Sequence, residues 1–199
     1  MDVKEPDLSG TYTYADYLTW DCDQLAELIH GKVYKMSPAP SSDHQGISGN
    51  LFVPIWNYFK GKKCKVFSAP FDVRLPGVSK KMGDKDIVTV VQPDICVICD
   101  LSKIDKRGCI GAPDWIIEIL SKYTSTKDLK IKFDVYEASG VNEYWVVHPE
   151  EHTLLIYKLD KQGKYKGGRK PFTRTDTVSP ATFPELRINL EEVFEEGEG

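Results

Sequence analysis

The sequence predicts an α/β fold, a central mixed β-sheet flanked by helices. Two neighbouring segments lead to this prediction. Residues Trp115 to Leu120 form a short and almost entirely apolar run, which is typical of a strand that is covered on both faces. Residues Thr124 to Ser139 follow with apolar side chains at helical spacing and end at Gly140, a common helix stop. A strand followed by a helix that packs on the sheet indicates a layered α/β domain.

The N-terminal part of the chain is predicted to contain two helices with a strand between them. Apolar residues recur at helical spacing from Tyr12 to Ile29, and Gly31 follows as a stop signal. Residues Lys32 to Met36 alternate between polar and apolar, as in a half-buried strand. A second helix is expected from His44 to Phe59, bent or broken near Pro54.

The middle and the end of the chain are predicted to be rich in strands. Pro93 lies inside one of the predicted strands, which indicates an edge position or a bulge there. The last two strands should form a pair. The predicted strands are Cys64 to Ser68, Phe71 to Leu75, Ile87 to Cys99, Asn142 to His148 and Thr153 to Leu159.

Length and composition favour a single domain over residues 1–199, and 199 residues suit one compact core. We expect a core at about 12–160, an extension at 161–199 and an acidic tail at about 191–199. The net charge of −4 excludes strong non-specific adhesion to nucleic acid, so a nucleic-acid role would need a local basic face.

The sequence also indicates a cytoplasmic protein. The N-terminus is polar, and the apolar runs are far too short to span a bilayer. An odd number of cysteines without framework spacing is typical of reduced thiols. Cys96 and Cys99 should face opposite sides of a strand, so we expect core thiols rather than a metal site. The five cysteines are Cys22, Cys64, Cys96, Cys99 and Cys109.

Glu118 stands out because it lies within the apolar run from Trp115 to Leu120. An unpaired buried carboxylate is costly, so a protein that keeps one has either paired it with another group or uses it in its function. Asp94 lies on the preceding predicted strand, and sequential strands are often neighbours. A divalent cation would relieve the repulsion between two such carboxylates, and oxygen ligands favour Mg²⁺ or Mn²⁺.

The helix after Glu118 supplies a cation. Asp128, Lys132 and Tyr136 are spaced by four residues, so they lie roughly along one helical face. If this face turns towards the sheet, Lys132 can bring its ammonium group to the acids. There it could stabilise charge that develops on a phosphate, or orient a water molecule.

With these residues the chain resembles the PD-(D/E)XK nuclease superfamily, and more closely its Uma2 branch (DUF820). The resemblance covers most of residues 12–160 and implies a restriction-endonuclease-like core. The matching stretches are ELIHGKVYKMSPAPSSDHQ, VFSAPFDVRL, VVQPDICVICD, GCIGAPDWIIEILS and KFDVYEASGVNEYWVVHP.

The resemblance implies a Mg²⁺-dependent (or Mn²⁺-dependent) endonuclease that hydrolyses DNA. By position, Asp94 and Glu118 match the two acids, and the carbonyl of Ile119 is expected to assist them at the metal. The superfamily usually has lysine where this chain has Leu120, and Lys132 matches the position that the Uma2 branch uses instead. Glu27 matches an assisting acid on the first predicted helix.

His30 and His148 depart from the branch, which is expected to have aspartate at both positions. Neither position belongs to the proposed centre, so the departure leaves the site prediction intact.

Several alternatives remain open at this point. Glu118 could be the structural ion-pair partner of Lys132 or Lys130, and the chain could be a non-catalytic nucleic-acid-binding or partner-binding protein. Double-strand cutting would be simplest for a symmetric homodimer. Four further residues could contact the substrate or could serve helix ends and packing: His44, Ser121, Lys130 and Tyr136.

Lysines gather in two places. Each run could be a solvated face or a phosphate-binding surface. The first comprises Lys122, Lys127, Lys130 and Lys132, around the proposed centre, and the second comprises Lys60, Lys62, Lys63 and Lys65.

Overall fold

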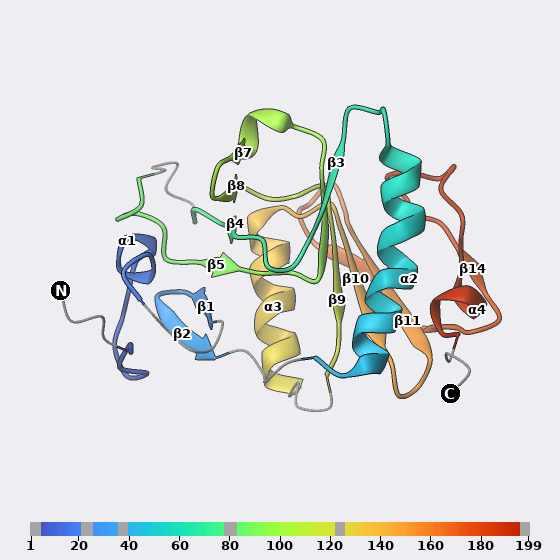
Figure 1. Ribbon diagram of the computed structural model, residues 1–199, viewed down its shortest axis with the longest axis horizontal. Coiled ribbons are helices and arrows are strands. Elements are labelled where there is room, and N and C mark those ends of the chain that lie inside the picture. Colours follow the sequence, from blue (N-terminus) through green and yellow to red (C-terminus); the bar gives the residue numbers. More distant parts are fainter. Residues whose placement is uncertain (1–4, 21–25, 36–39, 78–82, 122–125, 196–199) are drawn as a thin grey trace.

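The computed structural model describes residues 5–20, 26–35, 40–77, 83–121 and 126–195 (Figure 1). Its helices are α1 (Tyr14–Tyr17), α2 (Ser42–Phe59), α3 (Thr126–Ser139) and α4 (Leu190–Val193), with one 3-10 helix, η1 (Leu101–Lys103). Its strands are β1 (Ala26–Ile29), β2 (Lys32–Lys35), β3 (Lys65–Ser68), β4 (Val73–Arg74), β5 (Val90–Val91), β6 (Ile95–Ile98), β7 (Ile104–Asp105), β8 (Gly108–Ile110), β9 (Trp115–Ile119), β10 (Glu143–His148), β11 (Thr153–Leu159), β12 (Tyr165–Gly167), β13 (Phe172–Thr173), β14 (Thr177–Val178) and β15 (Ile188–Asn189).

The α/β class is confirmed, and the strands divide mainly between two sheets. The seven-stranded sheet has the order β12-β11-β10-β9-β6-β3, with β13 paired to β11. The six-stranded sheet has the order β2-β1-β5-β4-β8-β7. A short pair, β14 and β15, lies near the end of the chain.

β9 lies in the middle of the seven-stranded sheet, and all five of its residues are buried. Its alternate side chains enter two different cores. Trp115, Ile117 and Ile119 pack in the cluster that contains the apolar face of α2. Ile116 packs in the cluster that contains the apolar face of α3. Figure 1 shows the two helices beside this strand. The apolar run in the sequence therefore reflects a strand covered on both faces.

The predicted helix from Tyr12 to Ile29 is wrong. In the described part of this stretch only Tyr14–Tyr17 is helical, and Ala26–Ile29 is strand β1, antiparallel to β2. His30 and Gly31 join the two strands with positive φ angles of 50° and 77°. A two-residue hairpin turn requires such angles, so Gly31 serves a hairpin rather than a helix end. Glu27 consequently lies on a strand and not on a first helix.

The predicted strand from Ile87 to Cys99 is two short strands in different sheets. β5 belongs to the six-stranded sheet and β6 to the seven-stranded sheet. Pro93 lies between them, and proline cannot donate a hydrogen bond to a ladder. The strand expected at Phe71 to Leu75 is likewise reduced to Val73–Arg74.

Most other predicted elements are confirmed. α2 begins at Ser42, and the Ser41 hydroxyl accepts a hydrogen bond from the backbone N–H of His44 at 3.3 Å. Pro54 lies inside this helix without ending it. β2, β3, α3 and the antiparallel pair β10 and β11 occupy the expected stretches. Met36 and residues 124–125 lie outside the described residues.

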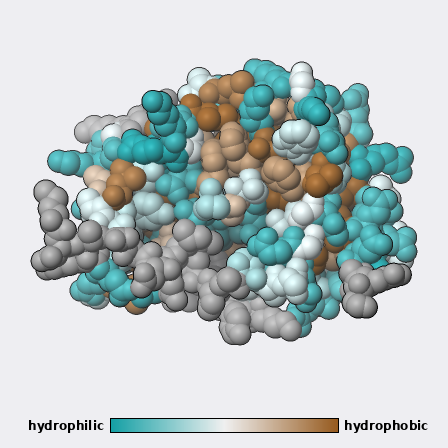
Figure 2. All heavy atoms as spheres, in the orientation of Figure 1, coloured by the Kyte–Doolittle hydropathy of each residue, from teal (hydrophilic) through white to brown (hydrophobic). Residues whose placement is uncertain are grey.

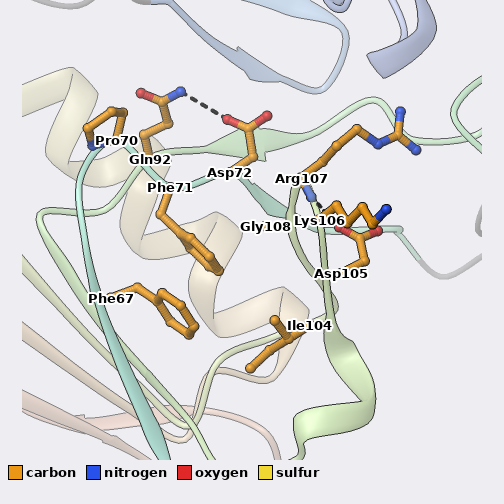
Figure 3. Close-up of a pocket in the computed structure, with 10 residues that line it drawn as sticks. All are labelled: Phe67, Pro70, Phe71, Asp72, Gln92, Ile104, Asp105, Lys106, Arg107 and Gly108. Carbon is orange, nitrogen blue, oxygen red and sulfur yellow. Dashed lines mark hydrogen bonds between the residues drawn. The ribbon is translucent and has the colours of Figure 1, made fainter.

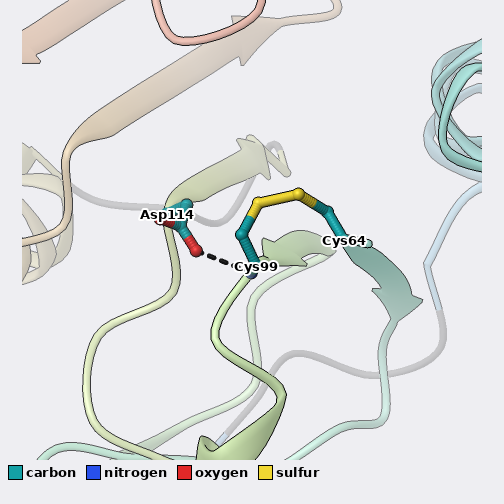
Figure 4. Close-up of a disulfide and its surroundings, with 3 residues drawn as sticks. All are labelled: Cys64, Cys99 and Asp114. Carbon is teal, nitrogen blue, oxygen red and sulfur yellow. Dashed lines mark hydrogen bonds between the residues drawn. A yellow bond between two sulfur atoms is a disulfide. The ribbon is translucent and has the colours of Figure 1, made fainter. Parts of the chain in front are cut away.

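The prediction that all cysteines are reduced thiols is wrong for two of them. Cys64 and Cys99 form a disulfide (Figure 4). β3 pairs antiparallel with β6, with Lys65 opposite Ile98, so Cys64 and Cys99 face each other one position further along. Cys96 and Cys109 are free and buried, as expected of core thiols. Cys22 lies outside the described residues.

None of the helices in the described ranges is both long enough and apolar enough to cross a bilayer.

A second buried carboxylate, Glu143, anchors the C-terminal part of the chain. Its side chain accepts hydrogen bonds from Trp145 Nε1 at 2.8 Å, from the backbone N–H groups of Ala181 and Thr182 at 3.0 Å each, and from Thr182 Oγ1 at 3.1 Å. Glu143 is 0% exposed. Every partner is a neutral donor, so this carboxylate has a structural role.

Replacing Glu143 should destabilise the fold without touching the catalytic candidates. We expect Glu143→Ala to lower the free energy of unfolding by roughly 3 kcal/mol, because buried N–H and O–H donors lose their acceptor. Urea denaturation measures this change. Glu191→Ala, at an exposed acid, is the control and should match wild type. Equal stability of the two variants would contradict the anchoring role.

Candidate active site

The ammonium group of Lys132 lies between two carboxylates. Lys132 Nζ is 2.9 Å from Glu118 Oε1 and 3.0 Å from Glu27 Oε1. Glu118 comes from β9 of the seven-stranded sheet, and Glu27 comes from β1 of the six-stranded sheet. Lys132 comes from α3, so the side chains that sequence analysis brought together do meet. Lys132 links the two sheets through a buried ion triad.

Tyr136 lies one helical turn after Lys132 and contacts the same carboxylate oxygen. Its hydroxyl donates a hydrogen bond to Glu118 Oε1 at 2.6 Å. Tyr136 is 0% exposed, so it positions Glu118 and does not face solvent as a substrate contact would. Within the described part of the chain, no hydrogen bond reaches Glu118 Oε2, which leaves this oxygen available to a ligand.

Asp94 lies next to Glu118 because β6 and β9 are hydrogen-bonded neighbours. The two strands are antiparallel and Ile95 lies opposite Ile117. Asp94, one residue before Ile95, therefore lies opposite Glu118, one residue after Ile117. Asp94 Oδ2 accepts a hydrogen bond from the backbone N–H of Ile119 at 2.7 Å. The structure thus brings the two acids together, with Glu118 on β9 and Asp94 immediately before the neighbouring strand β6.

His44 also belongs to this centre. Its Nε2 is 3.0 Å from the carbonyl oxygen of Ile119 and 3.4 Å from Asp94 Oδ1. Because the carbonyl can only accept, Nε2 carries the proton and donates. Burial lowers the pKa of His44, but the Asp94 carboxylate and the Ile119 carbonyl raise it above the ordinary value overall. The sequence offered His44 only as a substrate contact or a helix-end residue, and its contact with Asp94 was not foreseen.

Gln92 is a site residue that sequence analysis missed. Its backbone N–H donates to Glu27 Oε1 at 2.8 Å, so it orients Glu27 towards Lys132. In the sequence, the feature that could have identified Gln92 as a site residue is its position two residues before Asp94. Its side-chain amide donates to Tyr17 Oη at 3.1 Å and to Asp72 Oδ1 at 2.9 Å, which ties the centre to α1.

The other predicted site residues lie at or beyond the edge of the centre. Ser121 is half-buried just after β9. Lys130 is exposed and pairs with Asp134 at 3.2 Å, one turn along α3, so it does not neutralise Glu118. Lys122 lies outside the described residues, as do the side chains of Lys127 and Asp128.

Negative charge exceeds positive charge in the centre. Burial raises the pKa of Glu118 from 4.5 to about 7; Lys132 opposes this shift, while Asp94 and Glu27 add to it. Burial alone would lower the pKa of Lys132, but Glu118 and Glu27 raise it overall. The centre therefore holds one ammonium, which contacts Glu27 and Glu118, and a third carboxylate, Asp94, which contacts His44.

The donor set was tested against a divalent cation. In the described ranges, no group of three or more His, Cys, Asp or Glu side chains could hold a metal ion by itself. A metal would therefore need a main-chain donor beside the carboxylates, and the Ile119 carbonyl next to Asp94 supplies one. Carboxylate and carbonyl oxygens suit Mg²⁺ or Mn²⁺, and a double positive charge would balance the surplus of carboxylates.

A cavity of about 420 Å³ opens on a different side of Gln92 (Figure 3). Phe67, Phe71 and Ile104 line its apolar part, and their side chains lie near one another in Figure 3. Figure 2 shows hydrophobic residues gathered near the middle of the face that it draws, with hydrophilic ones around them. Asp94, Glu118 and Lys132 do not line the cavity, which shares Gln92 with the candidate active site.

The α/β fold of the chain is shared with a solved structure. A crystal structure of "a putative nuclease belonging to DUF820" from Anabaena variabilis ATCC 29413 matches with a TM-score of 0.69. The match covers 92% of this chain and 97% of that chain at 21% identity, and it shows the shared fold.

The sequence comparison is more specific. A model of the Uma2 family, described as "Putative restriction endonuclease", matches residues 14–191. The chain belongs to the Uma2 family, which confirms the resemblance found in the sequence. An uncharacterized protein, slr1290, from Synechocystis sp. (strain ATCC 27184 / PCC 6803 / Kazusa) is 23% identical over 153 residues, 75% of each chain.

The raised pKa of Glu118 predicts a pH dependence of stability. Between 4.5 and about 7 the folded chain holds this proton more tightly than the unfolded chain does. The free energy of unfolding should therefore fall as the pH rises through this interval. We expect the wild type to lose stability relative to Glu118→Gln over this range, as measured by urea denaturation in EDTA. The exposed-site variant Glu191→Gln should follow wild type. A difference between wild type and Glu118→Gln that does not change with pH would contradict the shift.

Proposed function

We propose that the chain is a metal-dependent endonuclease of the PD-(D/E)XK type, which hydrolyses phosphodiester bonds in DNA with Mg²⁺ or Mn²⁺. The observation that carries this proposal is the contact of Lys132 with Glu118, next to Asp94 on the neighbouring strand. Membership of the Uma2 family supports a nuclease. The side chains of Lys132 and Asp94 are each 18% exposed, so a substrate phosphate can approach them.

Asp94, Glu118 and the Ile119 carbonyl would hold the metal ion. When bound, the ion lowers the pKa of a water molecule and polarises the scissile phosphate. Lys132 and Tyr136 both engage Glu118 Oε1, and no other described residue donates a hydrogen bond to Oε2. The Ile119 N–H bond to Asp94 Oδ2 similarly fixes the carboxylate of Asp94. The chain thus orients two carboxylates before any ligand arrives, and this preorganisation favours catalysis.

Lys132 would place its positive charge beside the reacting phosphate. There it would orient the attacking water or stabilise the negative charge that grows on the phosphate oxygens. Glu27 would assist by holding Lys132 from the second sheet, and the Gln92 N–H keeps Glu27 in place. His44 would orient Asp94 and the Ile119 carbonyl through Nε2.

A cleavage assay tests this proposal. Supercoiled and single-stranded DNA are incubated with the protein and Mg²⁺ or Mn²⁺. We expect EDTA to abolish cleavage, and we expect Asp94→Asn and Lys132→Met each to lower the rate by about 100-fold or more, because each removes charge stabilisation at the reacting phosphate. Asp134→Asn and Lys161→Met change the same residue types at exposed positions and should retain wild-type rates.

Circular dichroism and urea denaturation identify variants that fail to fold, since breaking a buried ion pair costs about 3–5 kcal/mol. Asp94→Asn keeps the shape of the side chain and is the more informative variant. Equal cleavage by wild type and Asp94→Asn would contradict the proposal. DNA binding by the wild type without metal-dependent cleavage would favour the alternative of a non-catalytic nucleic-acid-binding protein.

A further inference from the structure

The C-terminal end of α2 carries positive charge that the candidate active site does not use. Four of the six residues from 60 to 65 are lysines, and none of the six is acidic. The chain as a whole has a net charge of −4, so this segment is a local exception. We call the group formed by these exposed lysines, the exposed Trp56 and the half-buried Tyr58 the α2-end patch. It comprises Trp56, Tyr58, Lys60, Lys62, Lys63 and Lys65.

Carboxylates do not neutralise these lysines. Within the described part of the chain, none of the four takes part in an ion pair at 4.0 Å or less. The nearby exposed acid is Asp100, whose pKa is lowered mainly by Ser102 and only weakly by Lys103 and Lys63. The lysine charges are therefore available to an anionic partner.

Two of the lysines lie over aromatic rings instead. Lys60 Nζ is 5.2 Å from the centre of the Trp56 ring, and Lys62 Nζ is 3.2 Å from the centre of the Tyr58 ring. Trp56 lies in the last turn of α2 and Lys60 caps the helix, whereas Lys62 lies in the turn after it, where its N–H donates to the carbonyl oxygen of Phe59 at 2.9 Å. Trp56 is 44% exposed, although the opposite face of α2 packs in the core. The surface at the end of α2 therefore carries lysine ammonium groups next to the exposed indole of Trp56.

α2 connects this patch rigidly to the candidate active site. The helix is unbroken from Ser42 to Phe59, and His44 in its first turn contacts Asp94 (Figure 1). Twelve residues separate His44 from Trp56, which at 1.5 Å per residue is about 18 Å along the helix. That length corresponds to about five nucleotides at 3.4 Å each.

We propose that the α2-end patch is a second nucleic-acid contact, which binds the substrate about five nucleotides from the scissile phosphate. The lysines would bind phosphates, and Trp56 would stack on a base. Lysines beside an exposed aromatic ring match a strand that offers both phosphates and flat bases. This inference rests on the proposed nuclease function and adds a contact outside the catalytic centre.

The test measures binding of a labelled 25-nucleotide single strand by fluorescence anisotropy at several salt concentrations in EDTA. We compare wild type with Lys60→Gln/Lys62→Gln and with the matched control Lys85→Gln/Lys161→Gln, which removes the same charge at exposed sites elsewhere. The patch variant should reduce the slope of log K against log salt by about 1.4, because each phosphate contact to a single strand contributes about 0.7. The control should keep the wild-type slope.

Tryptophan fluorescence tests the stacking directly. Binding of DNA should quench part of the wild-type emission, and Trp56→Phe should lose that part of the quenching. Equal salt slopes for the patch variant and its control, or unchanged quenching in Trp56→Phe, would overturn the inference. Binding to vesicles of anionic lipid that the patch variant loses, with unchanged DNA binding, would overturn it as well.

Cleavage assays separate this inference from the proposed function. Lys60→Gln/Lys62→Gln should raise the DNA concentration needed for half-maximal cleavage, and Lys85→Gln/Lys161→Gln should keep the wild-type value. If the wild type cleaves DNA but the patch variant binds like its control, only the inference fails. If the patch binds DNA but the wild type never cleaves, the proposed function fails and the binding surface remains.

Discussion

The contact of one ammonium group with two carboxylates from different sheets is the constraint on which the site depends. Lys132 Nζ lies within 3.0 Å of both Glu118 on β9 and Glu27 on β1. Buried charges are tolerated only when they are paired in good geometry, so α3 must lie where Lys132 can reach both. The same contact therefore fixes the helix against the seven-stranded sheet and joins the six-stranded sheet to it.

The two buried glutamates of the structure show why Glu118 differs from a structural acid. Glu143 receives four hydrogen bonds from neutral donors, and both of its oxygens are engaged. Glu118 receives its bonds on Oε1, has charged neighbours, and has a raised pKa because of burial. A centre with three carboxylates and one lysine, which contacts two of them, offers oxygen ligands and negative charge that suit a divalent cation.

The sequence predicted those parts of the structure that depend on local pattern. The apolar run around Glu118, the spacing of Lys132 and Tyr136, and the partner Asp94 all follow from periodicity and from the order of strands. The position of Glu27 could not be read correctly, because a helical spacing of apolar residues also fits a hairpin whose turn is His30-Gly31. The Cys64–Cys99 pair and the Gln92 N–H contact depend on strand register, which no single segment reveals.

The most direct test of the account is a crystal structure of the protein with Mn²⁺, in which anomalous scattering locates the ion. The account predicts a peak about 2.2 Å from oxygens of Asp94 and Glu118 and from the Ile119 carbonyl, with Lys132 still in contact with Glu118. A peak bound only elsewhere on the molecule, or carboxylates of Asp94 and Glu118 that point away from the ion, would contradict it.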